Sequence, residues 1–281
     1  MQVYCLPLEL IAFAIHPGDT QSTTTVCVEV SIRCLYLTSQ SNSDFAGVTV
    51  ETIHGIIDFL ATASSNYQRG VWDLKKCKEE FWLNHCALAD KQNATGSLAV
   101  RKKIDEIYNK LYHQLWKKFL LKSYGSATLS TLKGMIREII VINDENISYH
   151  GSIDRTGVHG ESRILRFLFI RDYPTIHLAR TGTFFYLLPS QPLDKDTQDN
   201  ARTWFKEKIS VEQLAMGSSQ GTCLGCCNCL DEFSIARGDS GNKPGQWLDP
   251  ITFRGTQGTT EINTSSDRLH AIFVAYKYII V

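Results

Sequence analysis

The feature that most constrains this fold is a pair of short motifs that lie far apart in the chain. His159, Gly160 and Glu161 form the first motif, and Cys223 and Cys226 form a Cys-x-x-Cys pair in the second. One imidazole and two thiolates are common zinc ligands, and three protein ligands leave the fourth tetrahedral position for water. A chain that uses them together has to fold so that both motifs meet.

Cysteine usage and hydropathy indicate the class of protein. The chain has 281 residues, 43% of them hydrophobic, which is enough for a packed core and excludes overall disorder. Nine cysteines is an odd count, whereas a secreted disulfide framework is shorter, denser in cysteine and even in number. No apolar run approaches the roughly 20 residues of a membrane span, and no basic leader precedes the first apolar stretch. We therefore expect a cytoplasmic protein with reduced thiols and no membrane segment.

The charges balance overall but are segregated along the chain. Basic and acidic residues number 29 each, which argues against a surface that binds nucleic acid everywhere. Residues 101–138, however, contain nine basic residues and three acidic ones. This segment predicts a local basic surface and favours a polymeric, phosphate-bearing partner.

The spacing of apolar residues divides the chain into two regions. The first forty residues alternate around β-branched positions, which predicts strand followed by loop. From Val48 to about Tyr124 the apolar residues recur at helical spacing, as in Ile53, Ile56 and Ile57. We expect a mainly helical N-terminal region over residues 1–125 and a separate domain over residues 126–281.

The second region predicts alternating strands and helices. A hairpin is expected over 135–157, a helix directly after His159, and further strands at 184–189, 210–219 and 270–281. Residues 190–208 read as a polar insertion. Cys223 and Cys226 directly follow a predicted strand and would begin a helix, whose dipole favours thiolates.

With H-x-E and C-x-x-C each at a predicted helix start, the sequence resembles the zinc-dependent cytidine and nucleic-acid deaminase superfamily. The small polar residues of GSSQGTC before the second motif are similar to its toxin-like branch. The resemblance covers roughly residues 130–281. It implies an α/β fold with a cytidine-deaminase-like mixed sheet of about five strands and helices on its faces.

The resemblance also implies roles for the motif residues. His159, Cys223 and Cys226 match the ligands of Zn²⁺, and Glu161 matches the proton shuttle of a hydrolase. Activated water would attack the carbon that bears the exocyclic amine of a cytosine-type base. The expected partner is a nucleic acid, with single strands favoured, or a nucleoside; the oligomeric state stays open.

Three further polar residues are candidate substrate contacts: Asn146, Ser218 and Ser219. Each is also a residue type that commonly caps helices or forms turns.

Departures from the family pattern leave alternatives open. Thr222 stands where the family usually has proline, and the stretch between the two motifs is longer than usual. Cys226 and Cys229 form a second, overlapping Cys-x-x-Cys pair. A closed structural zinc site of a binding module could use His159 with three of the cysteines. A cysteine hydrolase could use Cys223 as nucleophile, with His159 or His270 as base.

Overall fold

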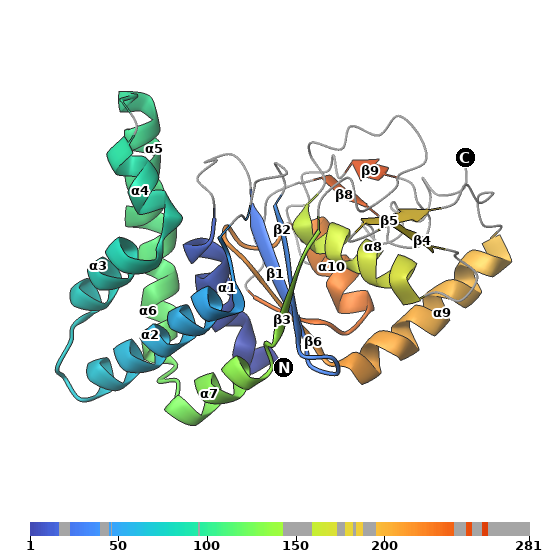
Figure 1. Cartoon of the computed structure of the whole chain (residues 1–281), viewed down its shortest axis with the longest axis horizontal. Coiled ribbons are helices and arrows are strands. Elements are labelled where there is room, and N and C mark those ends of the chain that lie inside the picture. The colour runs from blue at the N-terminus through green and yellow to red at the C-terminus, as the bar shows by residue number, and fades with distance from the viewer. Residues whose placement is uncertain are drawn as a thin grey trace, which may run out of the picture.

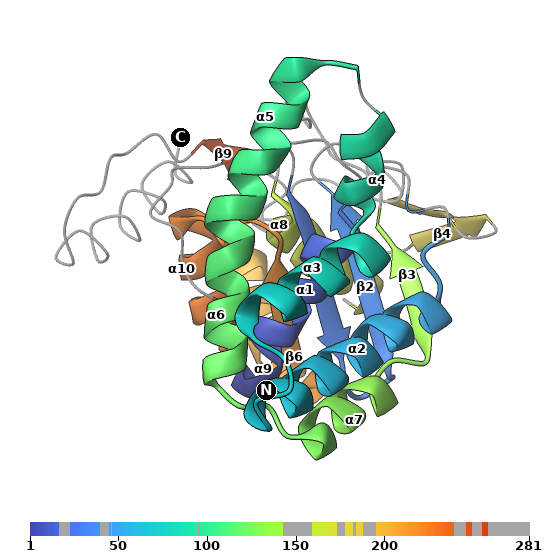
Figure 2. The same ribbon diagram turned by 90° about the vertical axis from the view of Figure 1, so that its left-hand side faces the viewer.

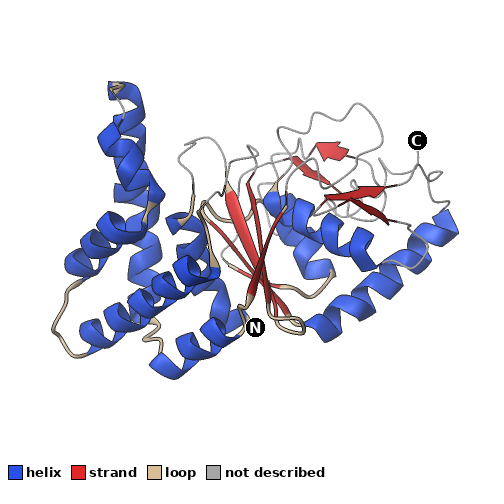
Figure 3. Cartoon of the chain, in the orientation of Figure 1, coloured by secondary structure: helices blue, strands red, loops and turns tan. Residues whose placement is uncertain are grey.

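A mixed five-stranded sheet lies at the centre of the fold, in the strand order β3-β2-β1-β6-β7 (Figures 1 and 3). The computed structural model describes residues 1–16, 23–39, 45, 47–94, 96–142, 159–172, 178–181, 184–187, 195–238, 246–248 and 255–257. The strands of the sheet are β1 (Thr24–Glu29), β2 (Cys34–Ser39), β3 (Glu138–Val141), β6 (Leu214–Ser218) and β7 (Ala236–Arg237). The α/β class and the sheet of about five strands are therefore confirmed.

The sheet is assembled from distant segments. β1 pairs antiparallel with β2 and with β6, so that Val26 faces Leu37 on one side and Gly217 on the other. β3 runs parallel to β2, and β7 runs parallel to β6. We expect a domain boundary after residue 125. The sheet contains β1 and β2 from before this position, and β3, β6 and β7 from after it.

The hairpin of this sheet is not the one that the sequence pattern predicts. β1 and β2 form it, joined by a turn in which Arg33 has a φ of 57°. Of the hairpin expected over 135–157, Glu138–Val141 is a strand that pairs with β2, and residues 143–157 lie outside the described residues. A strand pattern identifies a strand but not its partner, because pairing depends on contacts between distant segments.

One face of the sheet is covered by α1 (Cys5–Ala14), and further helices pack outside it (Figures 1 and 2). All ten residues of α1 are buried. The prediction of strand for the start of the chain is therefore wrong at residues 5–14. The helix lies between the sheet and other helices, so it has no polar face and shows no helical periodicity in its sequence.

The helices outside α1 form the region that the sequence predicts as helical. They are α2 (Val50–Gln68), α3 (Leu74–His85), α4 (Ala87–Ala94), α5 (Leu98–Ile107), η2 (Tyr108–Tyr112) and α6 (His113–Leu121). A short helical turn, η1 (Gln2–Tyr4), precedes α1, and a further helix, α7 (Ser126–Gly134), lies beyond the stretch that the sequence predicts as helical. Ile53, Ile56 and Ile57, the expected apolar stripe of α2, are all buried.

The opposite face of the sheet carries α8 (Gly160–Asp172), α9 (Lys195–Glu212) and α10 (Leu224–Glu232) (Figure 1). Residues 190–208, interpreted from the sequence as a polar insertion, largely belong to the helix α9. Because α9 extends to Glu212, the strand expected from residue 210 begins at Leu214. Two small antiparallel pairs complete the described elements: β4 (Leu178–Thr181) with β5 (Phe184–Leu187), and β8 (Gln246–Leu248) with β9 (Gly255–Gln257). The strand expected at 270–281 lies outside the described residues.

The alternation of side chains along β1 and β2 divides the interior into two hydrophobic cores. Val26, Val28 and Leu37 face α1 and the helices outside it. Cys27 and Tyr36 face the core that holds α8, α9 and α10. Among the described residues, no helix is both long enough and apolar enough to cross a membrane.

Candidate metal centre

The two motifs meet at the starts of α8 and α10. His159 directly precedes α8, and its carbonyl oxygen accepts a hydrogen bond from the backbone N–H of Arg163 at 3.2 Å. Cys223 is the N-cap of α10, with its Sγ 3.4 Å from the donating backbone N–H of Cys226. His159 therefore lies before the first helical turn, as expected for a histidine that shares a site with the residue two positions later.

Three side chains converge there as a group that could hold a metal ion. The donor atoms of His159, Cys223 and Cys226 all lie within 4.8 Å of one another. Nδ1 of His159 is 3.7 Å from Sγ of Cys226. Bond lengths to tetrahedral zinc imply a nitrogen to sulfur separation of about 3.6 Å. The arrangement thus fits a tetrahedral ion without large movement of this ligand pair.

Hydrogen bonds among the three groups shift the pKa values of the two thiols in opposite directions. The hydrogen bond with Cys226 lowers the pKa of the Cys223 thiol, and the hydrogen bond with Cys223 raises the pKa of Cys226. Burial by itself lowers the pKa of His159, but its hydrogen bond with Cys223 and the charge of that thiolate raise it overall. Metal binding requires both thiols and the imidazole to give up their protons, so that an ion would displace any proton on these groups.

Glu161 lies beside these ligands and is buried. Its atom Oε2 has no hydrogen-bond partner among the described residues. Burial raises the pKa of the Glu161 carboxyl, while the charge of His159 lowers it in part. A hydrogen bond with Thr222 also lowers this pKa. An acceptor oxygen therefore remains available next to the three ligands.

Gly160 allows α8 to begin close to the sheet. A Cβ atom at this position would lie 2.5 Å from Oγ1 and 2.7 Å from Cβ of Thr25, and 2.9 Å from Cγ2 of Thr38. These separations are well below van der Waals contact. The glycine thus fixes the distance between the H-x-E motif and the strands β1 and β2.

The remaining cysteines of the cluster serve other contacts. Cys227 donates its thiol to the carbonyl oxygen of Thr222 at 3.5 Å. Cys229 packs in the core with Leu230 and Phe233. Neither belongs to the ligand group found among the described residues, which uses Cys223 together with Cys226.

The candidate substrate residues have mixed positions. Ser218 and Ser219 lie at the end of β6, where their hydroxyl groups contact β1. Oγ of Ser218 is 3.4 Å from Oγ1 of Thr25, and Oγ of Ser219 accepts the backbone N–H of Thr24 at 3.0 Å. Both serines thus tie two strands together at this end of the sheet. Asn146 lies outside the described residues.

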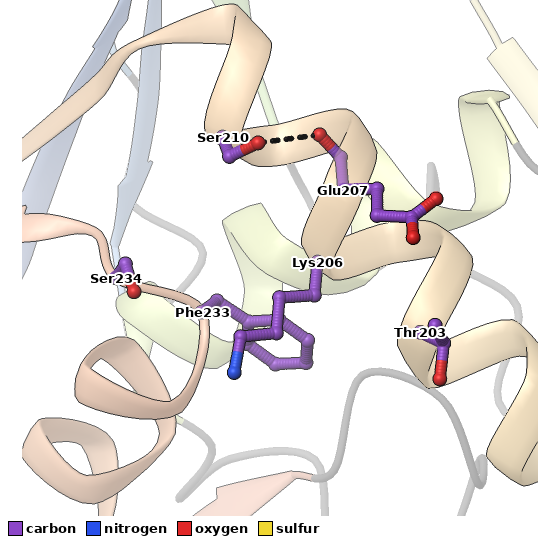
Figure 4. A pocket seen from close by; sticks show the side chains of 6 residues that line it. All are labelled: Thr203, Lys206, Glu207, Ser210, Phe233 and Ser234. Carbon is purple, nitrogen blue, oxygen red and sulfur yellow. Dashed lines mark hydrogen bonds between the residues drawn. The ribbon is translucent and has the colours of Figure 1, made fainter.

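A separate pocket lies between α9 and the end of α10 (Figure 4). Its lining includes Lys206, Phe233 and Ser234, and Ser210 donates a hydrogen bond to the carbonyl oxygen of Glu207 at 2.7 Å. None of the residues of the metal centre lines this pocket.

Sequence reasoning missed the contact of Thr222 with Glu161 and a contact of Ser162 with Cys226. The position of Ser162 three residues after His159 is a helical spacing that could have indicated the second of these contacts.

Comparison with known proteins adds no family assignment: no protein-family model, curated protein or solved structure matches this chain. Functional inference therefore rests on the geometry of the site.

Proposed function

We propose that this protein is a zinc-dependent hydrolytic deaminase that acts on a cytosine-type base in a nucleic acid or nucleotide. The observation that carries the proposal is a three-ligand group, His159, Cys223 and Cys226, beside a buried glutamate with an unpartnered oxygen among the described residues. Three protein ligands with an adjacent carboxylate are typical of catalytic zinc sites.

The order of elements around the site supports this proposal. The helix α8, with H-x-E at its start, is followed by β4, β5 and α9, and then by β6, α10 with C-x-x-C at its start, and β7. The family resemblance implies a hairpin, helix, strand, helix and strand, and the part from α8 to β7 agrees with it once β4, β5 and α9 are taken as an insertion before β6. Here the hairpin is separated from α8 by the helices α2 to α7 and the strand β3.

The chemistry assigned to the chain is proton transfer. Zinc, when bound, supplies a Lewis acid that lowers the pKa of a coordinated water toward neutrality. Glu161 would take a proton from the attacking water and deliver protons to the ring nitrogen and to the departing ammonia. The new C–O bond replaces the C–N bond, so the overall reaction is hydrolysis and needs no oxidant or reductant. Burial suits this role because it raises the pKa of the Glu161 carboxyl, and a raised pKa makes a carboxylate a better proton acceptor.

A closed structural site, the non-enzymatic alternative, requires a fourth protein ligand. The two other cysteines of the cluster, Cys227 and Cys229, make contacts outside the ligand group. Within the described part of the chain, an open fourth position is therefore the better interpretation.

The form of the substrate is part of the proposal, with single-stranded nucleic acid favoured over a free nucleoside. Its basis is the charge of residues 101–138, in which Lys117 and Lys118 of α6 are exposed. α6 and α5 lie across the sheet from α8 and α10 (Figure 1). A strand that contacts both α6 and the metal centre would have to pass around the sheet.

The proposal is tested with the variant Glu161→Gln. General acid–base groups contribute about 10² to 10⁴ in rate, so the variant is expected to lose activity by such a factor. Its zinc content, measured by elemental analysis, is expected to stay at that of the native protein. Purified protein is assayed for ammonia release from cytidine, a cytidine nucleotide and cytosine-containing single strands.

Glu212→Gln is the matched control, because Glu212 is also a buried glutamate but lies at the end of α9, away from the motifs. It is expected to retain activity. Native protein that binds zinc but releases no ammonia from any of these substrates would refute the proposal. Loss of zinc in Glu161→Gln would instead make the glutamate a ligand and the site structural.

A further inference from the structure

We propose that Ser162 is a positioning residue of the metal centre, whose hydroxyl donates a hydrogen bond to the thiolate of Cys226. This inference rests on the proposed function only in taking His159, Cys223 and Cys226 as metal ligands. It adds a residue outside the H-x-E and C-x-x-C motifs that sets the electronic character of one ligand.

The geometry brings the hydroxyl to the sulfur from the neighbouring helix. Oγ of Ser162 lies 3.7 Å from Sγ of Cys226, although the two residues are 64 positions apart in the chain. Ser162 is 1% exposed and Cys226 is 0% exposed, so bulk water does not compete for either group. Ser162 also lies in the first turn of α8, directly after the H-x-E motif that provides His159.

Each ligand sulfur thereby has beside it a hydrogen-bonding group that is not itself a ligand atom. Sγ of Cys223 accepts the backbone N–H of Cys226 at 3.4 Å, within the first turn of α10. Sγ of Cys226 is buried more deeply, and the hydroxyl of Ser162 is its neighbour on α8. Hydrogen-bond donors around metal ligands fix the orientation of the ligands. They also withdraw electron density from the thiolate, so that the metal keeps its strength as a Lewis acid.

The experiment compares metal binding by native protein and by Ser162→Ala. Removal of an outer hydrogen bond weakens metal affinity by about 10- to 100-fold, and we expect zinc affinity to fall within this range in competition with a chelator. In Co²⁺-loaded protein, the sulfur-to-cobalt charge-transfer band is expected to move to lower energy, because the thiolate without its donor holds its electrons less tightly. Ser162→Thr, which keeps the hydroxyl, is expected to retain the native band.

Ser64→Ala is the matched control. Ser64 is also 1% exposed and also donates a hydrogen bond, to the carbonyl oxygen of Tyr124 at 2.7 Å, but it lies in α2 on the other side of the sheet. Its replacement is expected to leave zinc affinity and the cobalt spectrum unchanged. If Ser162→Ala does not fold, Ser162→Thr and Ser162→Val provide the same comparison, since they differ in the hydroxyl at nearly equal volume.

The outcomes separate this inference from the proposed function. If the native protein binds metal but the variant without the hydroxyl has an unchanged zinc affinity or an unchanged cobalt band, the role of Ser162 is overturned. The deaminase proposal is then unaffected. Native protein that binds neither zinc nor cobalt overturns both.

Discussion

Replacing Gly160 by alanine tests whether close contact between α8 and the sheet positions the site. The added Cβ would lie 2.7 Å from Cβ of Thr25, against an optimal carbon–carbon separation of about 3.5 Å or more. The start of α8 would therefore have to retreat by about 1 Å, because the obstructing atoms include Cβ of Thr25, which is fixed to the strand. Overpacking of this kind costs about 1 to 3 kcal/mol of unfolding free energy.

The same retreat would carry His159 and Glu161 away from the ligands on α10. A displacement of about 1 Å in a catalytic group can cost 10²-fold in rate, so we expect activity to fall by about two orders of magnitude. Unfolding in denaturant measures the stability, and ammonia release measures the activity.

The control substitution is Gly55→Ala in the middle of α2, where no described atom lies within 4 Å of the added Cβ. Alanine is favoured over glycine inside a helix by about 1 kcal/mol, so this variant should gain stability. The reasoning is refuted if Gly160→Ala has the same denaturant midpoint of unfolding as the native protein and also keeps native activity.

Two further predictions concern the ligands and the partner. Cys226→Ser is expected to reduce bound zinc sharply, whereas Cys227→Ser should retain about one zinc per chain, as measured by elemental analysis; an equal reduction in both variants would contradict the ligand assignment. Reversal of Lys117 and Lys118 to glutamate is expected to weaken binding of a single-stranded oligonucleotide, and to flatten its salt dependence by about 0.7 in log–log slope for each phosphate that the variant no longer neutralises. Unchanged binding in a fluorescence anisotropy titration would remove the basic helices from the interface.

Local sequence was sufficient where an element has one buried side and one exposed side. The stripe of Ile53, Ile56 and Ile57 predicted α2 because the opposite face of that helix is polar and exposed. The motif helices were also predictable, since His159 and Cys223 each stand at a helix start. α9 carried a similar signal in Ala201 and Phe205, four residues apart and both buried, but its many polar residues obscured it.

Local sequence was insufficient for α1. Each residue from Cys5 to Ala14 is buried, so the helix has no exposed face from which a period could be read. The propensity of the residues then leaves helix and strand unresolved for a short apolar run.

The sequence by itself determined which residue types could form a metal site and that they begin two helices. Only the tertiary structure decided that β1 pairs with β6, that Gly160 contacts Thr25, and that Ser162 reaches Cys226. The physical reason is that helix formation depends on neighbours within a few residues, whereas strand partners and interhelical contacts depend on the packing of segments far apart in the chain.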